Sequence, residues 1–471
     1  MIPRYAHPNM TEIWTDESKF QAWLQVELAV LKARDELRQI PSGVYERVCD
    51  AVGDFNRLST PIAEAISRRD KVIRHDLNAF VEIVRAMIVL GKEGPGAFEA
   101  NALNLYGDQF HSAIDRAIKT NDSDASWFHD GLTSYDTEEP ATALLLRKAC
   151  NAIDDDASRV CDALRELALK NQDIAMIGRT HGQHAQPITF GAKVLNWYEM
   201  MTRFRKRLHS SHNEAVCMKL SGAVGMYGTL GPEIEERVAE ILRLSVSPVS
   251  TQIVPLDRRA QLVNTLAEGA CVVEKIARDL WIMAQSEVGE ITEGFGKKQK
   301  GSSAMPHKKN PITLEQLFGL PRLIRAYASA MMENVATASE RDISQSSVER
   351  IAIPDAFGLL DHMLIKLADV LGTMYVNRER MLKNLTEGTL GRYASQKAEQ
   401  LLKRKGMSAE DAYRAVQQAC TGKRHLKEEL LNDKDVAKFV TEDDLKAVFS
   451  LYTWTIHEKE LYARVLEHKR I

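Results

Sequence analysis

The chain has 471 residues and nearly balanced charge: 62 lysines and arginines against 65 aspartates and glutamates give a formal net charge of −3 at pH 7. Its 44% hydrophobic and 27% charged residues are typical of a globular protein and exclude wholesale disorder, which requires few apolar residues and strong net charge. The lack of a basic excess argues against a protein that coats nucleic acid.

The first residues, MIPRYAHPNM, have no apolar core, so we expect no secretory signal here. No apolar run approaches the ~18–20 residues of a membrane span, so we expect no membrane contact. The six cysteines are scattered and form no C-x-x-C pair, which argues against a zinc ribbon or a redox motif. We therefore expect reduced thiols in a cytoplasmic protein.

Apolar spacing along the chain predicts long helices. One helical stripe consists of Ala149, Ile153, Val160, Leu164 and Leu167. A second stripe falls in a proline-free stretch and consists of Leu262, Leu266, Ala270, Val273, Ala277, Leu280, Ala284, Val288 and Ile291. Strand signals are weak, so we expect an all-α fold whose long helices pack as a bundle.

Three loop-like regions separate these helical patterns, at residues 129–140, 178–187 and 294–311. Each is rich in Gly, Ser, Thr, His or Pro, and catalytic residues concentrate on loops held by rigid scaffolds. A smaller elaboration is expected near residues 91–96 and 121–124.

The loop at 294–311 carries the most chemistry. Its glycines and the pair Ser302 and Ser303 precede the run MPHKKNP. Successive amides in such a loop can form an anion-binding nest, to which Lys308 and Asn310 add a charge and an amide donor. The alternative is a solvated loop with a basic run. The pattern is not G-x-x-x-x-G-K-[ST], so a nucleoside triphosphatase is not supported.

The loop at 178–187 contains His181 and His184. Their spacing could hold a metal on a helix, but Gly182 and Pro187 disfavour a helix and no nearby carboxylate completes a site. An acid or base role is favoured, because imidazole titrates near neutral pH. A hydrogen-bonded structural role is the alternative, and we expect it for His184.

Two further basic groups stand out. Arg74, His75 and Asp76 lie at a predicted helix start, and Arg341 and Arg350 flank the run SQSSVE. Arginines beside acids commonly form surface ion pairs, but two arginines with serines also suit a phosphate. Spacing does not decide between these roles.

Taken together, these segments resemble the fumarase/aspartase superfamily of lyases. Its signature G-S-S-x-M-P-x-K-x-N-P is matched by residues 301–311, and the resemblance extends over essentially the whole chain. Within the superfamily the chain is most similar to the bacterial adenylosuccinate lyase family. The supporting runs include RHD at 74–76, HDGLTS at 129–134, GRTHGQHAQPITFG at 178–191 and ERDISQSSVERI at 340–351.

The resemblance implies three helical domains, expected at residues 1–128, 129–375 and 376–471, with a bundle of long helices in the second. It also implies a homotetramer in which each active site draws residues from three chains. The implied reaction is a β-elimination that cleaves adenylosuccinate to AMP and fumarate, and that cleaves the related succinyl-aminoimidazole-carboxamide ribotide. We expect a small nucleotide substrate and no metal or organic cofactor, because side chains supply the acid, the base and the carboxylate stabilisers.

The resemblance also implies residue roles. Ser302 is the base, unless Ser303 exchanges roles with it, while His181 is the general acid and Glu315 orients it. Lys308 and Asn310 surround the succinyl carboxylates, and His75 and His129 are further active-site histidines. The positions that match nucleotide and phosphate contacts are Arg4, Tyr5, Arg74, Asp76, Thr133, Ser134, Gln252, Arg341, Ser346 and Arg350.

Two departures from the family pattern bear on these roles. Asp130 follows His129 where an aromatic residue is usual, and an extra acid there would weaken the affinity for a polyanion or reorient His129. Residues 86–127 form a longer segment than in compact members. The competing interpretations are a related lyase, acting on argininosuccinate or a carboxymuconate, and a non-catalytic helical scaffold.

Overall fold

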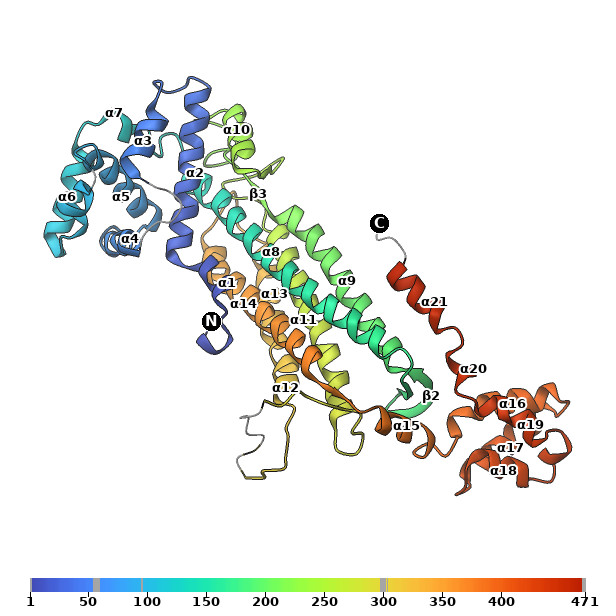
Figure 1. The fold of residues 1–471 in the computed structure, drawn as a ribbon. Coiled ribbons are helices and arrows are strands. Elements are labelled where there is room, and N and C mark those ends of the chain that lie inside the picture. The colour runs from blue at the N-terminus through green and yellow to red at the C-terminus, as the bar shows by residue number, and fades with distance from the viewer. Residues whose placement is uncertain (1, 54–59, 95, 297–301, 303, 468–471) are drawn as a thin grey trace. The chain divides into compact units, whose positions relative to one another are not determined.

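The computed structural model describes residues 2–53, 60–94, 96–296, 302 and 304–467. Within these residues the chain is mostly helical, and its short strands form three two-stranded sheets (Figure 1). The predicted all-α class with long helices is confirmed. None of the described helices combines the length and the apolar content needed to cross a bilayer.

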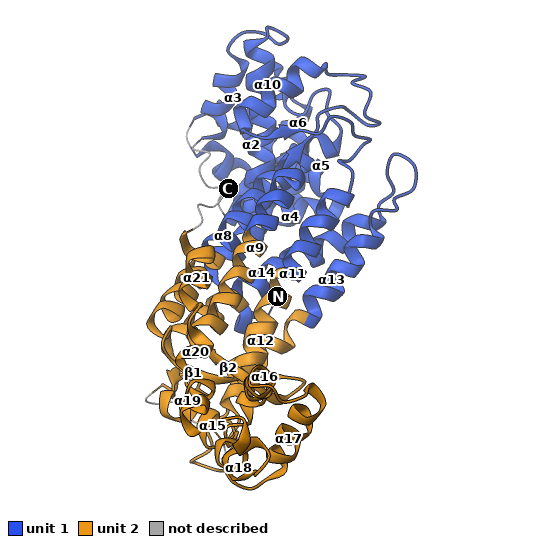
Figure 2. Cartoon of the chain, turned by 90° about the vertical axis from the view of Figure 1, so that its right-hand side faces the viewer, with its two compact units in different colours: residues 1–155, 206–268, 322–362 blue, residues 156–205, 269–321, 363–471 orange. Residues whose placement is uncertain are grey.

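The chain divides into two compact units (Figure 2). Unit 1 comprises Met1–Asp155, Lys206–Glu268 and Arg322–His362, and unit 2 comprises Asp156–Arg205, Gly269–Pro321 and Met363–Ile471. Four of the five boundaries fall within long helices, namely α8 (Ser134–Lys170), α9 (Phe190–Ala215), α11 (Asp257–Ala284) and α14 (Ser344–Thr373), and the fifth falls at the start of α13 (Pro321–Glu333). The division into three consecutive domains stays a prediction.

Unit 1 also contains a set of shorter elements. They are η1 (Pro3–Tyr5), α1 (Pro8–Thr11), η2 (Glu12–Trp14), α2 (Asp16–Glu36), α3 (Val44–Val52), α4 (Thr60–Ile73), α5 (Asp76–Gly91), η3 (Glu99–Leu103), α6 (Gly107–Lys119), α7 (Ser123–Trp127), β3 (Cys217–Met218), α10 (Pro232–Leu242), β4 (Ser245–Val246) and most of α13 (Pro321–Glu333).

Unit 2 adds a hairpin, β1 (Ala175–Thr180) with β2 (Gln183–Thr189), and the pair β5 (Ile291–Thr292) with β6 (Tyr375–Val376). Its shorter helical elements are α12 (Ile312–Gly319), α15 (Arg378–Thr386), η4 (Arg392–Ala394), α16 (Ser395–Arg404), α17 (Ala409–Thr421), α18 (Leu426–Asn432), η5 (Val436–Lys438), α19 (Glu442–Phe449), α20 (Tyr452–Thr455), α21 (Glu458–Tyr462) and η6 (Ala463–Glu467).

Both predicted stripes lie on long helices. In α8 the side chains of Ala149, Ile153, Val160 and Leu164 are fully buried, as helical periodicity requires of a core-facing stripe. The second stripe lies on α11, but that helix ends at Ala284. The expectation that its last two positions are helical is wrong, because the chain turns at Val288 and enters β5 at Ile291.

Polar contacts tie the long helices together inside each unit. In unit 1, Arg259 of α11 pairs with Glu139 of α8, and with Glu349 of α14 at 3.1 Å. In unit 2, the indole of Trp197 on α9 donates to Asp279 on α11 at 3.0 Å. Such contacts fix the rotation of each helix about its axis, so side chains on adjacent turns keep defined positions.

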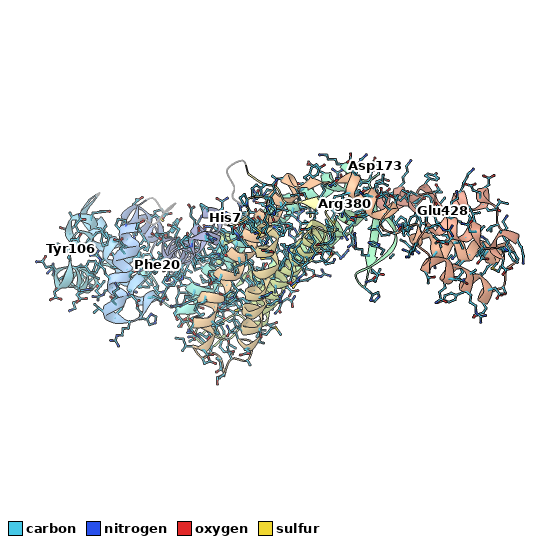
Figure 3. All side chains as sticks on the ribbon, turned by 90° about the horizontal axis from the view of Figure 1, so that it is seen from below. His7, Phe20, Tyr106, Asp173, Arg380 and Glu428 are labelled. Atoms are coloured by element: carbon cyan, nitrogen blue, oxygen red, sulfur yellow. The ribbon has the colours of Figure 1, made fainter. Side chains whose placement is uncertain are left out.

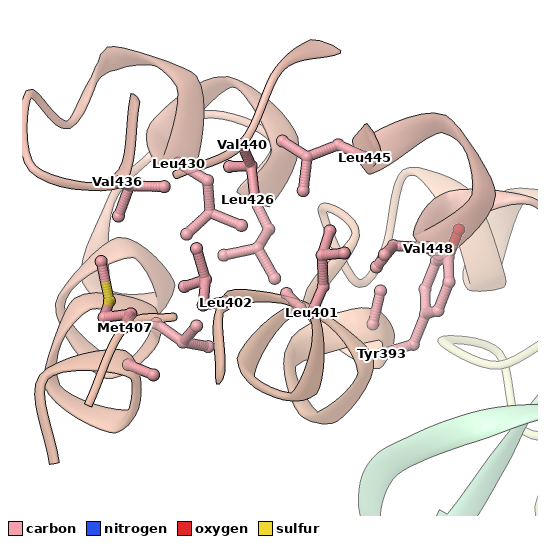
Figure 4. Close-up of a cluster of buried hydrophobic side chains, with 14 of the residues drawn as sticks. Tyr393, Leu401, Leu402, Met407, Leu426, Leu430, Val436, Val440, Leu445 and Val448 are labelled. Carbon is pink, nitrogen blue, oxygen red and sulfur yellow. The ribbon is translucent and has the colours of Figure 1, made fainter. Parts of the chain in front are cut away.

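Each unit has a distinct apolar cluster. In unit 1, Phe20 and Trp23 of α2 contact Phe80 of α5, with the Trp23 and Phe80 ring centroids 5.5 Å apart; Figure 3 labels Phe20. In unit 2, buried side chains of α16, α18 and α19, such as Leu402, Leu430 and Leu445, form the cluster in Figure 4. These clusters bury the apolar faces of the shorter helices.

Two of the three expected loops contain regular structure. Helix α8 begins at Ser134, so only the first part of the region 129–140 is a loop. Pro140 is inside the helix, where it removes a single backbone bond, the one to the Asp136 carbonyl, without ending the helix. Residues 178–187 form most of the β1–β2 hairpin, which the sequence reading missed. The described residues between β5 and α12 contain no helix or strand, as predicted.

Candidate functional site

Unit 1 contains a polar pocket of about 520 Å³ that collects predicted site residues from distant parts of the sequence. Three segments line it: the end of α4 with the start of α5, the first turns of α8, and the start of α14 with the residues before it. The predicted residues in its wall are Arg74, His75, Asp76, Ser134, Arg341, Ser346 and Arg350. The pocket therefore unites cationic, hydroxyl and carboxylate groups in one place.

Arg341 is held in this pocket by a chain of contacts. Its guanidinium carbon lies 3.8 Å from the ring centroid of Tyr135, and its Nη1 donates to Gln252 Oε1 at 3.2 Å. Gln252 in turn donates to the Thr133 hydroxyl at 3.3 Å. Arg341, Gln252 and Thr133, all predicted nucleotide contacts, are thus physically connected, and Arg341 keeps donors for an anion.

The turn that carries Thr133 and Ser134 is fixed by Asp136, which sequence reasoning missed. Its carboxylate accepts from the Thr133 amide at 2.9 Å and from the Gly222 amide at 3.1 Å, and it pairs with Lys219 Nζ at 2.7 Å. Asp136 and Lys219 are both essentially buried. The buried Asp136–Lys219 pair forms further hydrogen bonds to backbone groups, and these bonds require a defined geometry. The pair therefore fixes the position of this turn.

Helix α5 begins beside the pocket, as the sequence predicted. His75 is the N-cap residue, and its Nδ1 accepts from the Asn78 amide at 3.2 Å. Asp76 pairs with Arg350 at 3.0 Å. Arg74 has a positive φ of 55°, which turns the backbone sharply between α4 and α5. This turn places all three predicted residues in the pocket wall.

His129 does not line this pocket, but it has a defined partner. Its Nδ1 lies 2.7 Å from Glu27 Oε1, and the Thr137 hydroxyl donates to the same oxygen at 2.6 Å. Burial alone would lower the pKa of His129, but the charge and hydrogen bond of Glu27 outweigh burial, so the pKa is raised. Glu27 was not predicted from the sequence.

Asp130 has a partner other than His129. Its carboxylate pairs with Arg34 at 3.0 Å, and its backbone carbonyl accepts from the same guanidinium at 3.0 Å. Arg34 pairs with Asp130 while Glu27 pairs with His129, so the two side chains have separate partners, and the effect of Asp130 on substrate affinity stays a prediction.

Arg4 and Tyr5 lie outside the pocket in this chain. Arg4 is exposed in η1, and the Tyr5 ring meets the His362 ring edge-on with centroids 5.0 Å apart. His7, labelled in Figure 3, lies with Nε2 3.0 Å from His362 Nδ1. These contacts attach the N-terminal segment to α14.

His181 lies at the tip of the β1–β2 hairpin in unit 2. Thr180 and Gln183 are paired, and the two residues between them have positive φ, 52° for His181 and 73° for Gly182. Two successive left-handed residues are the mark of a type I′ turn, whose usual Asn-Gly signal is here replaced by His-Gly. The turn exposes the imidazole of His181.

His184 does not have the predicted structural hydrogen bond to a described residue. Its side chain is exposed on β2. Partial desolvation of the ring and the nearby charge of Arg179 lower the pKa of His184. The described residues contain no group of three or more His, Cys, Asp or Glu side chains arranged to hold a metal ion.

Ser302 belongs to the described part of the signature loop, whereas Ser303 and Gly301 lie outside the described residues. The Ser302 hydroxyl oxygen accepts hydrogen bonds from the amides of Ala304 at 3.3 Å and Met305 at 3.1 Å. Backbone amides that point at an oxygen favour its ionised form. The described donors to Ser302 are thus amides of the same loop, from residues that follow the serine.

The residue that precedes the loop caps α12, the helix that follows the loop. Glu293 accepts from the amides of Thr313 and Leu314, at 3.3 and 3.1 Å, and so caps the start of this helix. Glu315 lies in the first turn, as predicted, and accepts from the Trp281 indole at 3.4 Å. Lys308 is exposed and Asn310 is half-buried. No contact between Glu315 and His181 is present within the described part of this chain.

Glu138 is a pocket residue that was not predicted from the sequence. It lies one helical turn after Ser134 and lines the same pocket. Burial, reinforced by the charge of Asp76, raises its pKa to about 7, although Arg350 and Arg341 act in the opposite direction. Its raised pKa comes from burial and from neighbouring charges, which are brought together only in the folded chain.

Comparisons with known proteins identify the family of the chain. A protein-family model described as "Lyase" matches residues 4–324. Over 469 residues the chain is 38% identical to "Adenylosuccinate lyase" of Aquifex aeolicus, covering 99% of each chain. Over 468 residues it is 39% identical to "Adenylosuccinate lyase" of Thermotoga maritima, covering 98% of this chain and 99% of the other.

Solved structures show the same fold. A fumarate lyase from Mesorhizobium sp. BNC1 matches with a TM-score of 0.83 at 23% identity, over 100% of both chains. The 3-carboxy-cis,cis-muconate lactonizing enzyme from Pseudomonas putida matches with a TM-score of 0.81 at 23% identity, over 98% of this chain and 97% of the other. The chain therefore belongs to this lyase family, within the fumarase/aspartase superfamily, and is a full-length homologue of bacterial adenylosuccinate lyases.

Proposed function

We propose that the protein cleaves adenylosuccinate to AMP and fumarate, and cleaves succinyl-aminoimidazole-carboxamide ribotide at the same site. The observation that carries this proposal is the unit 1 pocket, in which Arg74, Arg341 and Arg350 converge with the hydroxyls of Ser134 and Ser346. Guanidinium groups with hydroxyl donors suit a phosphomonoester, which a nucleotide substrate carries and a simple dicarboxylate lacks. The full-length relatives named adenylosuccinate lyase support the same substrate.

The reaction requires a base that removes a weakly acidic proton from the carbon next to a succinyl carboxylate. In our proposal Ser302, or Ser303 beside it, takes that proton. Serine is a weak base unless its alkoxide is stabilised. The amides of Ala304 and Met305, which donate to the Ser302 oxygen, supply such stabilisation.

The electron pair left on carbon passes through an aci-carboxylate and then forms the double bond of fumarate as the C–N bond breaks. Lys308 and Asn310 are proposed to stabilise the carboxylate charge during this step. His181 donates a proton to the departing nitrogen of AMP, and Glu315 is proposed to orient it. The exposure of His181 at a hairpin tip supports a role that reaches out to a ligand.

The nucleotide is proposed to lie against unit 1. Its phosphate is held by Arg341, Arg350 and Ser346, with Arg74 adjacent. Thr133, Ser134 and Gln252 contact the remainder, together with His75, Asp76 and His129. Arg4 and Tyr5 lie outside this pocket in the same chain, and their role as contacts of the nucleotide or its phosphate remains part of the proposal.

We further propose a homotetramer in the cytoplasm, with each active site shared between subunits. The predicted groups are divided between two units. His181 and Ser302 belong to unit 2, whereas the pocket lined by Arg74, Arg341 and Arg350, here called the arginine pocket, belongs to unit 1. Apolar side chains are exposed on α13, at Leu323 and Met332, and on α14, at Ile351. Burying such side chains against other copies of the chain favours association.

The direct test is to mix the purified protein with adenylosuccinate and follow fumarate by absorbance. We expect stoichiometric formation of fumarate and AMP. No fumarate from adenylosuccinate, together with elimination from argininosuccinate or another dicarboxylate, would contradict the proposal. Light scattering during size-exclusion chromatography tests the tetramer.

A further inference from the structure

Glu138 lines two neighbouring pockets of unit 1. One is the arginine pocket of about 520 Å³, and the other, of about 350 Å³, is lined by Trp14 and Trp23 and shares Tyr135, Ser346 and Arg350 with the first. Ser134 and Glu138 are four residues apart on α8, so they share one helix face. The carboxyl group of Glu138 is therefore part of the wall in which the proposed phosphate site lies.

The charged groups around Glu138 come from several elements. From the side of the arginine pocket, its cations are Lys71, Arg74, Arg341 and Arg350. The other acids there are Asp70 and Asp76, and His75 is the titratable base. From the second pocket the charged groups are Asp16, Lys19, Arg259 and Glu349, and Glu139 on the same helix is paired with Arg259.

Most of these acids have partners. Asp76 accepts from Arg350, and Glu139 and Glu349 pair with Arg259. Among the described residues, Glu138 forms no salt bridge. Burial and the charge of Asp76 together raise its pKa to about 7, against the opposing effect of Arg350 and Arg341. Near neutral pH this carboxyl group therefore exists as both the acid and the carboxylate.

We propose that Glu138 couples anion binding to proton uptake: it takes a proton from solvent when a phosphate dianion is bound by Arg341 and Arg350. The inference rests on the proposed phosphate site. The dianion adds negative charge next to a carboxyl group that is already poorly solvated, so the neutral acid becomes the favoured form. The proton adds to a carboxylate oxygen, and no bond of the ligand changes.

The coupling has a defined sign. A bound dianion stabilises protonated Glu138, so by linkage protonated Glu138 strengthens dianion binding. Affinity must therefore decrease as the pH rises above about 7, by at most about tenfold per pH unit for one coupled proton. The pocket thus releases a phosphorylated ligand more readily in alkaline solution.

Calorimetric titration of the full-length protein with AMP at pH 7.5, in buffers of different ionisation enthalpy, tests this coupling. The AMP phosphate is already mostly dianionic there, because its second pKa is about 6. We expect uptake of a substantial fraction of a proton per AMP, and several-fold weaker binding at pH 8.7 than at pH 7.2. Glu138→Gln should abolish the uptake and flatten the pH dependence.

Two variants make the test specific. Asp70→Asn removes a carboxylate from the same pocket and should retain the proton uptake, whereas equal loss in both variants would overturn the inference. Uptake that survives in Glu138→Gln would place the proton on another group, such as His75, and would also overturn it. Glu138→Asp keeps a carboxyl group and should retain the coupling, so it provides the comparison if the glutamine variant misfolds.

Sulfate binding tests this inference separately from the proposed function. Sulfate keeps two negative charges throughout this pH range and has no nucleobase. Proton-coupled sulfate binding without cleavage of adenylosuccinate would contradict the proposed function and support the role of Glu138. Cleavage of adenylosuccinate with AMP and sulfate binding that take up no proton would overturn the inference alone. Failure of sulfate to bind would also overturn it.

Discussion

Arg34 binds Asp130 through both its carboxylate and its backbone carbonyl, each at 3.0 Å. The guanidinium also faces the indole of Trp127, with 5.3 Å between the guanidinium carbon and the ring centroid. Arg34 is buried, whereas Asp130 is half-exposed. The unusual acid beside His129 is thus paired with an arginine of α2.

Arg34→Met should destabilise this turn more than Asp130→Asn does. The methionine leaves a carbonyl and a carboxylate without their donor, and we expect a loss of about 1–2 kcal/mol in the free energy of unfolding. Asp130→Asn keeps an acceptor for Arg34 and should cost less. Chemical denaturation of both variants checks the order, and equal stability of Arg34→Met and the wild type would contradict it.

The His129–Glu27 pair should make stability depend on pH. The folded-state pKa of His129 is raised, so the stabilisation is fully present below the unfolded pKa of about 6.5 and is lost as the pH rises through the folded value. Glu27→Gln should therefore lower the melting temperature more at pH 6 than at pH 8.5. Thr137→Val removes the hydrogen bond that an uncharged hydroxyl donates to the same oxygen. It should lower the melting temperature by a similar amount at pH 6 and pH 8.5. A pH-independent effect of Glu27→Gln would refute this explanation.

His181→Asn should reduce kcat by about 10²–10⁴ if His181 is the general acid. Asparagine tolerates the positive φ of this position, so the hairpin turn should persist. His184→Asn changes an exposed histidine on the same hairpin and should leave kcat within about threefold of the wild type. Similar losses in both variants would indicate damage to the hairpin instead.

Ser302→Ala should abolish turnover, with kcat reduced by at least about 10³, because it removes the hydroxyl that the amides of Ala304 and Met305 surround. Ser303→Ala should cost less. Initial rates of fumarate release compare the two. The reverse order would assign the base to Ser303.

Arg341→Met should raise KM for adenylosuccinate by about 10- to 100-fold, the value of one or two charge-assisted hydrogen bonds to a phosphate. The kcat should change less, because Arg341 is not proposed to contact the reacting carbon. Steady-state kinetics give both constants. An unchanged KM would show that Arg341 does not bind the phosphate.

The sequence predicted the long helices well because their stripes satisfy one simple rule. Leu262 and Leu266 lie on α11, and Ile153 and Leu164 on α8, all buried. The same rule overran the end of α11 at Ile291, since a spacing of three or four residues also occurs by chance in a turn and a strand. Pro140 misled in the opposite direction, because a proline can remain within a helix that tertiary packing stabilises.

The site was less accessible to sequence reasoning. Arg74, Ser134 and Arg341 could be named individually, but only the fold places them in one pocket. Glu138 could not be predicted from the sequence, because its raised pKa results from burial beside other charged groups. Asp136 and Glu27 were missed for a similar reason: their roles are set by partners 83 and 102 residues away.

The two-residue tip of the β1–β2 hairpin limits how His181 can change during evolution or design. Because Thr180 pairs with Gln183, only two residues connect the strands. One added residue would therefore either reverse the alternation of side chains along β2 or create a bulge. Replacing Gly182 with any side chain would strain a backbone with φ of 73°. The reach of this imidazole is thus set by strand pairing, and length variants at this tip should be rare among working enzymes.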